Sequence, residues 1–204
     1  MTEQNKIAGV VLAGGMARRM GGQDKGLIRF AGRPLIDYAI KSMEKITPQI
    51  VISANRHLDQ YQAWGYPVIS DSGGDYLGPL AGIAEACRVI DADIMLVMPC
   101  DSPFFNAVHL QQMLEALSDD VDVVIASDGQ RVHPVFMVLK TRLRDSLDAY
   151  LAANGRRVQE WVTQQAGVMV EFKEPNNLFA NINTEIELLA LESRVNFNDP
   201  ATFL

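Results

Sequence analysis

The residues from Leu12 to Leu27, LAGGMARRMGGQDKGL, combine two Gly-Gly pairs with three cations and a single anion. Glycines such as Gly14 and Gly15 lack a Cβ atom, so backbone N–H groups can approach an anion closely. Lysine supplies a point charge and arginine a planar fork, and both suit phosphate oxygens. Because the whole chain has a net charge of −7, the cations Arg19 and Lys25 predict a local site for a small phosphate-bearing ligand.

This loop differs from two well-known nucleotide-binding patterns. After Gly22 the chain reads QDKG, with no Ser or Thr to bind magnesium, which disfavours a P-loop NTPase. The loop also lacks a G-x-G-x-x-G run that opens into a helix, which disfavours a dinucleotide-binding loop. A solvated, glycine-rich surface turn remains as an alternative, but the charge contrast with the rest of the chain favours a phosphate-binding loop of another kind.

Polar residues also follow the later hydrophobic runs. Ser53 and Asn55 come at the end of one run, Asp71 follows the next, and Asp101 follows a third. Magnesium takes one or two protein carboxylates and completes its shell with phosphate oxygens and water, so Asp101 is a candidate ligand. Two structural alternatives stay open: Asp101 could cap a helix that begins at Pro103, and Asp71 could stabilise a turn.

Seven apolar runs are typical of strands, and six segments between or after them have helical periodicity. Most of the runs are continuous, which indicates strands buried on both faces of a mostly parallel sheet. Ligands of such sheets bind outside the carboxyl ends of the strands, where these polar residues lie. The predicted strands are Ile7–Leu12, Ile50–Ser53, Pro67–Ile69, Ile94–Met98, Val121–Ala126, Val135–Leu139 and Val168–Phe172. The predicted helices begin at Pro34 and Pro79 or span Ala107–Leu117, Thr141–Ala153, Arg156–Gln165 and Thr184–Ser193.

Length and composition predict one α/β domain over residues 1–194 and a loosely ordered tail over residues 195–204. The acidic balance disfavours a nucleic-acid partner, and no apolar run is long enough to span a membrane. The N-terminal residues MTEQNK lack the apolar region of a secretory signal. We expect Cys87 and Cys100 to be reduced core residues of a cytoplasmic protein, and a monomer is the default for this size.

The stretch GVVLAGGMARRMGGQDKGL resembles the signature L-A-G-G-x-[SA]-x-R-M-G-x-D-K of nucleotidyltransferases with a Rossmann-like sheet, with Gly22 as one extra residue. The stretches ANRH, DSGGDYLGPLAG, MPCDSPF, GRRV and NINT follow in this order, and together they resemble the molybdenum cofactor guanylyltransferase family. The resemblance runs from Gly9 to about Leu191. It implies an α/β fold, a three-layer αβα sandwich that binds the nucleotide at the carboxyl ends of a mostly parallel sheet.

The resemblance implies transfer of GMP from GTP to the terminal phosphate of molybdenum-molybdopterin, with Mg²⁺ as cofactor and pyrophosphate as the leaving group. Lys25, Arg19 and Asp101 would be catalytic, with Asp101 as the metal ligand. The implied nucleotide contacts are Leu12, Ala13, Gly14, Gly15, Lys25, Ser53, Asn55, Asp71 and Asp101. The implied pterin-side contacts are Arg156, Arg157, Asn181 and Asn183. Molybdoenzymes or their chaperones would receive the product.

One position departs from the family pattern, because an asparagine often stands where this chain has Ser53. The sequence alone leaves open whether Ser53 or Asn55 contacts the nucleotide. Two other functions also stay open. One is a cytidylyltransferase acting on a pterin, sugar or isoprenoid phosphate, and the other is a non-catalytic GTP-binding protein that delivers the cofactor.

Overall fold

The computed structural model describes residues 5–13, 16–17, 22–71, 78–173, 178–182 and 184–193. Four predicted site residues and the predicted tail, residues 195–204, lie outside the described residues. The four site residues are Gly14, Gly15, Arg19 and Asn183.

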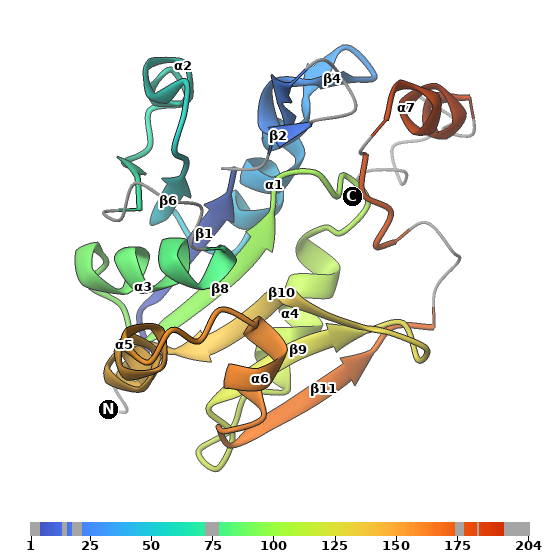
Figure 1. Ribbon diagram of the computed structural model, residues 1–204. Coiled ribbons are helices and arrows are strands. Elements are labelled where there is room, and N and C mark those ends of the chain that lie inside the picture. Colours follow the sequence, from blue (N-terminus) through green and yellow to red (C-terminus); the bar gives the residue numbers. More distant parts are fainter. Residues whose placement is uncertain are drawn as a thin grey trace.

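A seven-stranded sheet with the order β11-β9-β10-β8-β1-β6-β7 forms the centre of the protein (Figure 1). Strand β10 runs antiparallel to its neighbours β8 and β9, and every other pair in the sheet is parallel. The mostly parallel sheet predicted from the sequence is therefore confirmed. The strands are β1 (Ile7–Leu12), β6 (Ile50–Ser53), β7 (Val68–Ile69), β8 (Ile94–Pro99), β9 (Val123–Ser127), β10 (Val132–Lys140) and β11 (Gly167–Glu171).

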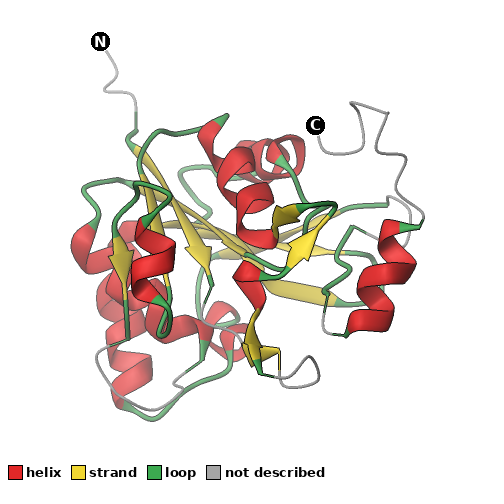
Figure 2. Ribbon diagram, turned by 90° about the horizontal axis from the view of Figure 1, so that it is seen from above, coloured by secondary structure: helices red, strands yellow, loops and turns green. Residues whose placement is uncertain are grey.

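Helices cover both faces of this sheet, which confirms the three-layer αβα sandwich (Figures 1 and 2). Successive side chains of a strand point to opposite faces, so in β1 Ala8 and Val10 join one buried cluster and Val11 joins the other. Helices α1 (Leu35–Glu44) and α4 (Ala107–Glu115) pack on the Val11 face. The other face is covered by α3 (Pro79–Val89), α5 (Arg144–Ala152) and α6 (Val158–Val162).

A third, smaller apolar cluster joins the N-terminal part of the chain to its C-terminal helix. Phe30 and Ile182 are fully buried in it, and Leu191 of α7 (Glu185–Glu192) packs there as well. The backbone N–H of Ile182 donates to the carbonyl of Asp101 over 3.3 Å. This packing therefore brings residues 178–182 beside the carboxyl end of β8.

Short elements that the apolar pattern did not predict stand at the same edge of the sheet. They include the paired strands β2 (Met16–Ala17) and β3 (Gln23–Asp24), the 3₁₀ turn η1 (Lys25–Leu27), the pair β4 (Arg29–Phe30) and β5 (Arg33–Pro34), and the helix α2 (Leu58–Gln62). Two-residue strands carry too little periodicity to be recognised in sequence.

Several predicted helix boundaries were wrong. The start predicted at Ala107, however, is confirmed: α4 begins there, where Asn106 caps it and His109 completes a capping box, and the alternative start at Pro103 is not used. The helix predicted from Arg156 is limited to α6, and the one predicted from Thr141 opens with a 3₁₀ turn, η2 (Thr141–Leu143). Within the described residues no helix is both long and apolar enough to cross a membrane.

Candidate functional site

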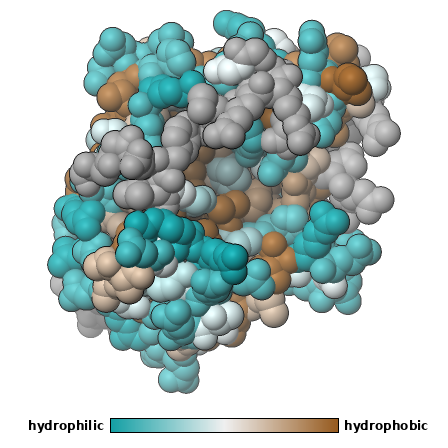
Figure 3. Space-filling model, viewed as in Figure 1, coloured by the Kyte–Doolittle hydropathy of each residue, from teal (hydrophilic) through white to brown (hydrophobic). Residues whose placement is uncertain are grey.

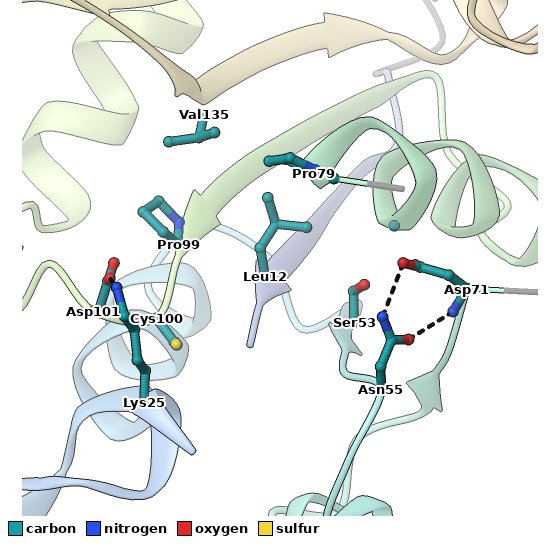
Figure 4. Close-up of a pocket in the computed structure, with 12 residues that line it drawn as sticks. Leu12, Lys25, Ser53, Asn55, Asp71, Pro79, Pro99, Cys100, Asp101 and Val135 are labelled. Carbon is teal, nitrogen blue, oxygen red and sulfur yellow. Dashed lines mark hydrogen bonds and ion pairs between the residues drawn. The ribbon is translucent and has the colours of Figure 1, made fainter. Parts of the chain in front are cut away.

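A cavity of about 270 Å³ opens at the carboxyl ends of β1, β6, β7 and β8, against the start of α3. Figure 4 shows two polar groups at opposite ends of this cavity, with apolar side chains between them. On the face seen in Figure 3, polar side chains dominate and hydrophobic ones gather near the middle. The lining residues are Leu12, Lys25, Ser53, Asn55, Asp71, Gly78, Pro79, Gly82, Pro99, Cys100, Asp101 and Val135.

The first polar end consists of Lys25 and Asp101. The Lys25 Nζ atom lies 2.8 Å from Asp101 Oδ2, and the two side chains are only 18% and 9% exposed. Lys25 begins η1, and Asp101 lies two residues past the end of β8, so each partner is attached to a different element. In this setting a phosphate could replace Asp101 as the partner of Lys25, and a metal ion could replace Lys25 as the partner of Asp101.

The second polar end is a reciprocal pair formed by Asn55 and Asp71. The Asn55 Nδ2 atom donates to Asp71 Oδ2 over 2.9 Å, and the backbone N–H of Asp71 donates to Asn55 Oδ1 over 2.9 Å. Asn55 therefore fixes the orientation of the Asp71 carboxylate at the rim of the cavity (Figure 4). Such a carboxylate can accept hydrogen bonds from ligand N–H or hydroxyl groups.

Close packing of α3 against β6 shapes the same end. A Cβ atom at Gly82 would collide with Ser53 Oγ, so glycine is required for this helix to approach the strand. Gly78, the residue before the helix, has a φ of +82°, which also favours glycine. Both Ser53 and Asn55 line the cavity, so the structure brings both candidates to the site.

Between the polar ends the lining is apolar and chemically inert. Leu12, Pro79, Pro99 and Val135 supply this surface (Figure 4). Cys100 also lines the cavity, and burial raises the pKa of its thiol well above the usual range. The thiol therefore stays protonated at neutral pH, which supports a packing role and argues against a nucleophile.

The buried carboxylate of Asp24 holds in place the segment that carries Lys25. Asp24 is 3% exposed, and its Oδ1 atom accepts hydrogen bonds from the Tyr61 hydroxyl and from the backbone N–H of Gly26, 3.2 Å away. Its Oδ2 atom lies 3.3 Å from His57 Nδ1. Burial raises the pKa of the Tyr61 hydroxyl, so this group remains a hydrogen-bond donor. A Cβ atom at Gly26 would collide with the Tyr61 hydroxyl, which explains the glycine.

The structure brings six of the predicted nucleotide-binding residues to one cavity. They are Leu12, Lys25, Ser53, Asn55, Asp71 and Asp101. Ala13 does not line the cavity: it is fully buried, and its N–H donates to the carbonyl of Ser53 over 2.8 Å. Asp24 was not predicted as a buried support, although it lies inside the recognised motif. Tyr61 was not predicted either, because the sequence offered no signal for it.

The predicted pterin-side residues separate into two places. Arg156 donates to the carbonyls of Leu151 in α5 and of Gly155, and the mostly exposed Arg157 pairs with Glu160. Neither arginine side chain lines the cavity. Asn181 instead lies close to Asp101. Its Oδ1 atom accepts a hydrogen bond of 2.7 Å from the hydroxyl of Ser102, the residue after Asp101. A role in pterin binding stays a prediction for all of them.

The cavity suits a metal ion whose ligands are mostly phosphate oxygens and water. The described residues contain no cluster of three or more His, Cys, Asp or Glu side chains able to enclose a metal. Magnesium needs only one or two protein carboxylates when phosphate oxygens and water fill the other positions. Asp101, largely buried and facing the cavity, fits that requirement.

Comparison with known proteins agrees with this geometry. Residues 9–168 match the family described as the MobA-like NTP transferase domain. A molybdenum cofactor guanylyltransferase from Shewanella loihica is 43% identical over 180 residues, which cover 88% of this chain and 92% of that protein. A protein of the same name from Shewanella halifaxensis is 44% identical over 185 residues, covering 90% and 92%.

Among solved structures, molybdopterin-guanine dinucleotide biosynthesis protein A from Archaeoglobus fulgidus has a similar fold. It superimposes with a TM-score of 0.74 and 23% identity, covering 92% of this chain and 97% of that one. At this level of identity the likeness concerns the fold, and it agrees with the three-layer architecture described above.

We predict that Tyr61→Phe destabilises the protein, because the buried Asp24 carboxylate then loses a donor. The expected loss is about 1–3 kcal/mol, and each kcal/mol lowers the melting temperature by about 2–4 °C in a chain of this length. Tyr66→Phe is the matched control, since its hydroxyl donates to Glu44 at the surface. Equal melting temperatures for the two variants in thermal unfolding would contradict the supporting role of Tyr61.

Proposed function

The chain belongs to the family of MobA-like NTP transferases, and on this premise we propose that it transfers GMP from GTP to the terminal phosphate of molybdenum-molybdopterin. The products would be molybdopterin guanine dinucleotide and pyrophosphate. The relatives named molybdenum cofactor guanylyltransferase cover about nine-tenths of this chain at 43–44% identity, which supports this reaction.

The observation that carries the proposal is the division of one cavity into two polar ends. The Asn55–Asp71 pair offers oriented acceptors for the N–H groups of a nucleoside, with the apolar surface of Leu12 and Pro79 beside it. Lys25 and Asp101 at the other end suit a phosphate chain with its counter-ion. A nucleoside triphosphate has this same order of groups, from base to terminal phosphate.

The reaction needs no protein nucleophile. An oxygen of the pterin's terminal phosphate attacks the α-phosphorus of GTP in line, a new P–O bond forms, and the bond to the β-phosphate oxygen breaks. The protein then mainly positions two anions and stabilises charge. We place the incoming phosphate on the side of Ser102 and Asn181, because these residues adjoin Asp101. Lys25 stabilises the charge that develops on the departing pyrophosphate.

Magnesium is the cofactor that this site would hold. Asp101 would be its protein ligand, and phosphate oxygens and water would complete its shell. When bound, the ion offsets the charge of the two approaching anions. Lys25 would then bind the phosphates in place of Asp101.

The remaining features of the proposal concern the cellular setting. We propose a cytoplasmic monomer that passes its product to molybdoenzymes or their chaperones. Cys87 and Cys100 are both free and buried, which suits a reducing compartment. The net charge of −7 suits a protein that does not bind nucleic acid.

Thermal unfolding with Mg²⁺ and GTP, CTP or ATP in turn tests the base preference. A ligand at 100 times its dissociation constant adds about 2.7 kcal/mol of stability, so GTP should raise the melting temperature by several degrees and CTP should not. Pyrophosphate release in the presence of loaded molybdopterin then tests transfer. Stabilisation by CTP alone would indicate a cytidylyltransferase, and GTP binding without pyrophosphate release would indicate a delivery protein.

We predict that Asp101→Asn folds but loses magnesium-dependent turnover. The amide oxygen of asparagine can still accept from Lys25, whereas its affinity for magnesium is much lower. Loss of one such charge contact typically costs about 10²–10³ in rate. Asp91→Asn is the control, because Asp91 is an exposed partner of Lys6. Turnover of Asp101→Asn within tenfold of the unaltered protein would remove Asp101 from the metal site.

We predict that Asn55→Ala weakens nucleoside recognition, since the Asp71 carboxylate loses its orienting donor. Binding of GMP, measured by calorimetry, should weaken by about tenfold, which corresponds to one hydrogen bond to a charged group. Binding of inorganic tripolyphosphate should not change. Gln111→Ala, on the exposed side of α4, is the control. A GMP affinity equal to that of the unaltered protein would show that Asn55 does not orient Asp71 for the nucleoside.

A further inference from the structure

Arg56 follows Asn55 directly and carries a charge that the described structure leaves without a partner. Its Nη1 atom is 3.5 Å from the carbonyl of Gly22, which is a long contact. Its Nε and Nη2 atoms are shielded from solvent, and neither meets a hydrogen-bond acceptor. Within the described residues no other buried side-chain nitrogen or oxygen lacks a partner.

An unsatisfied buried N–H group is costly, and each one in a folded protein calls for an explanation. The nearby carboxylate does not supply one. Asp24 accepts from Tyr61 and Gly26 and faces His57, and no ion pair joins it to Arg56 in the described part of the chain. The charge of Arg56 is therefore not neutralised by direct contact with a carboxylate there.

The two unpaired donors have a specific geometry. The Nε–H and Nη2–H groups of arginine lie side by side and point the same way, forming the fork that binds two oxygens of a carboxylate or phosphate at once. Arg56 leaves this fork unused and offers only Nη1 to the protein. An anion with two oxygens, such as a phosphate, would satisfy both donors at once.

Arg56 reaches toward the end of the cavity that is formed by Lys25 and Asp101. Its guanidinium contacts the carbonyl of Gly22, three residues before Lys25, and Lys25 lines this end of the cavity. Gly22 has a φ of +75°, and a Cβ atom there would meet no atom of the described residues within 4 Å. Arg56 therefore extends from the end of β6 toward the segment that carries the phosphate-binding lysine.

We propose that Arg56 is a further phosphate-binding residue of this site, which donates Nε–H and Nη2–H to the terminal phosphates of the bound nucleoside triphosphate. The proposal rests on the proposed function in taking a triphosphate as the ligand. Arg56 would hold the part of the substrate that departs as pyrophosphate, beside Lys25. Neither composition nor the glycine-rich motif assigns this role.

Calorimetry on the full chain with GTP, GMP and inorganic tripolyphosphate tests this assignment. For Arg56→Gln we expect GTP and tripolyphosphate to bind about 10- to 100-fold more weakly, because charged hydrogen bonds are lost, and GMP to bind as before. Arg56→Lys should restore only part of the affinity, since lysine lacks the fork. Arg144→Gln, a half-exposed arginine at the start of α5, is the control and should change none of the three.

Two measurements separate direct contact from a merely structural role. Without ligand, Arg56→Gln should melt no lower than the unaltered protein, because it removes an unsatisfied buried cation. In a Lys25→Gln background, Arg56→Gln should weaken tripolyphosphate binding further, since Arg56 contacts the phosphates by itself. A lower melting temperature, an equal loss for GMP, or no further loss in the Lys25→Gln background would overturn the proposal.

The role of Arg56 and the proposed guanylyl transfer can fail independently of each other. If tripolyphosphate binding depends on Arg56 but the chain releases no pyrophosphate from GTP with loaded molybdopterin, the guanylyl transfer fails and the role of Arg56 stands. If transfer occurs and Arg56→Gln binds GTP as tightly as the unaltered protein, the role of Arg56 fails alone. Absence of tripolyphosphate and GTP binding by the unaltered protein would overturn both.

Discussion

The Lys25–Asp101 end of the site depends on the hydrogen bonds that hold the buried carboxylate of Asp24. A charge removed from water is tolerated only when hydrogen bonds and counter-charges replace the lost solvent. Asp24 obtains them from Tyr61 in α2, from Gly26 in η1 and from His57. Since His57 and Tyr61 belong to one segment and Asp24 and Gly26 to another, these contacts fix the start of α2 against η1. That arrangement presents the next residue, Lys25, to Asp101.

Close packing applies the same restriction to the nucleoside end. Gly82 lets α3 approach Ser53, because a Cβ atom there would collide with Ser53 Oγ. The ends of β1, β6 and β8 are held in register by parallel pairing, which places Leu12 beside Ser53 and Pro99. The polar groups are thus attached to rigid strand ends, and a ligand meets them already oriented. Such preorganisation lowers the cost of binding.

The sequence predicted the central sheet well because its strands are continuous apolar runs, and such runs are buried on both faces. It also predicted Lys25, Asn55, Asp71 and Asp101 at one edge, since parallel strands end on the same side. The antiparallel direction of β10 could not be predicted, because an apolar run has the same composition in either direction. Tyr61 was missed for a related reason: it lies in a five-residue helix, and its contact with Asp24 spans 37 residues of chain.

Helix ends were the least predictable part of the fold. Pro103 offered an alternative first helical position, but the capping box of Asn106 and His109 starts α4 at Ala107, as its periodicity predicted. Two local signals competed there, and the one with two hydrogen bonds prevailed. The consequence for the site is direct, because Asp101 is not used as a helix cap and remains at the cavity with Lys25.

The cations at the phosphate end differ in what a ligand must displace. Lys25 is paired with Asp101, so a phosphate that binds Lys25 must first break an ion pair, and part of its binding free energy is offset. The proposed magnesium ion on Asp101 would limit that cost, because Lys25 and Asp101 would each exchange one opposite charge for another. Arg56 gives up no ion pair, since its Nε–H and Nη2–H groups have no acceptor in the described structure. A phosphate bound there relieves an existing penalty, and arginine can therefore add more affinity than the better-placed lysine.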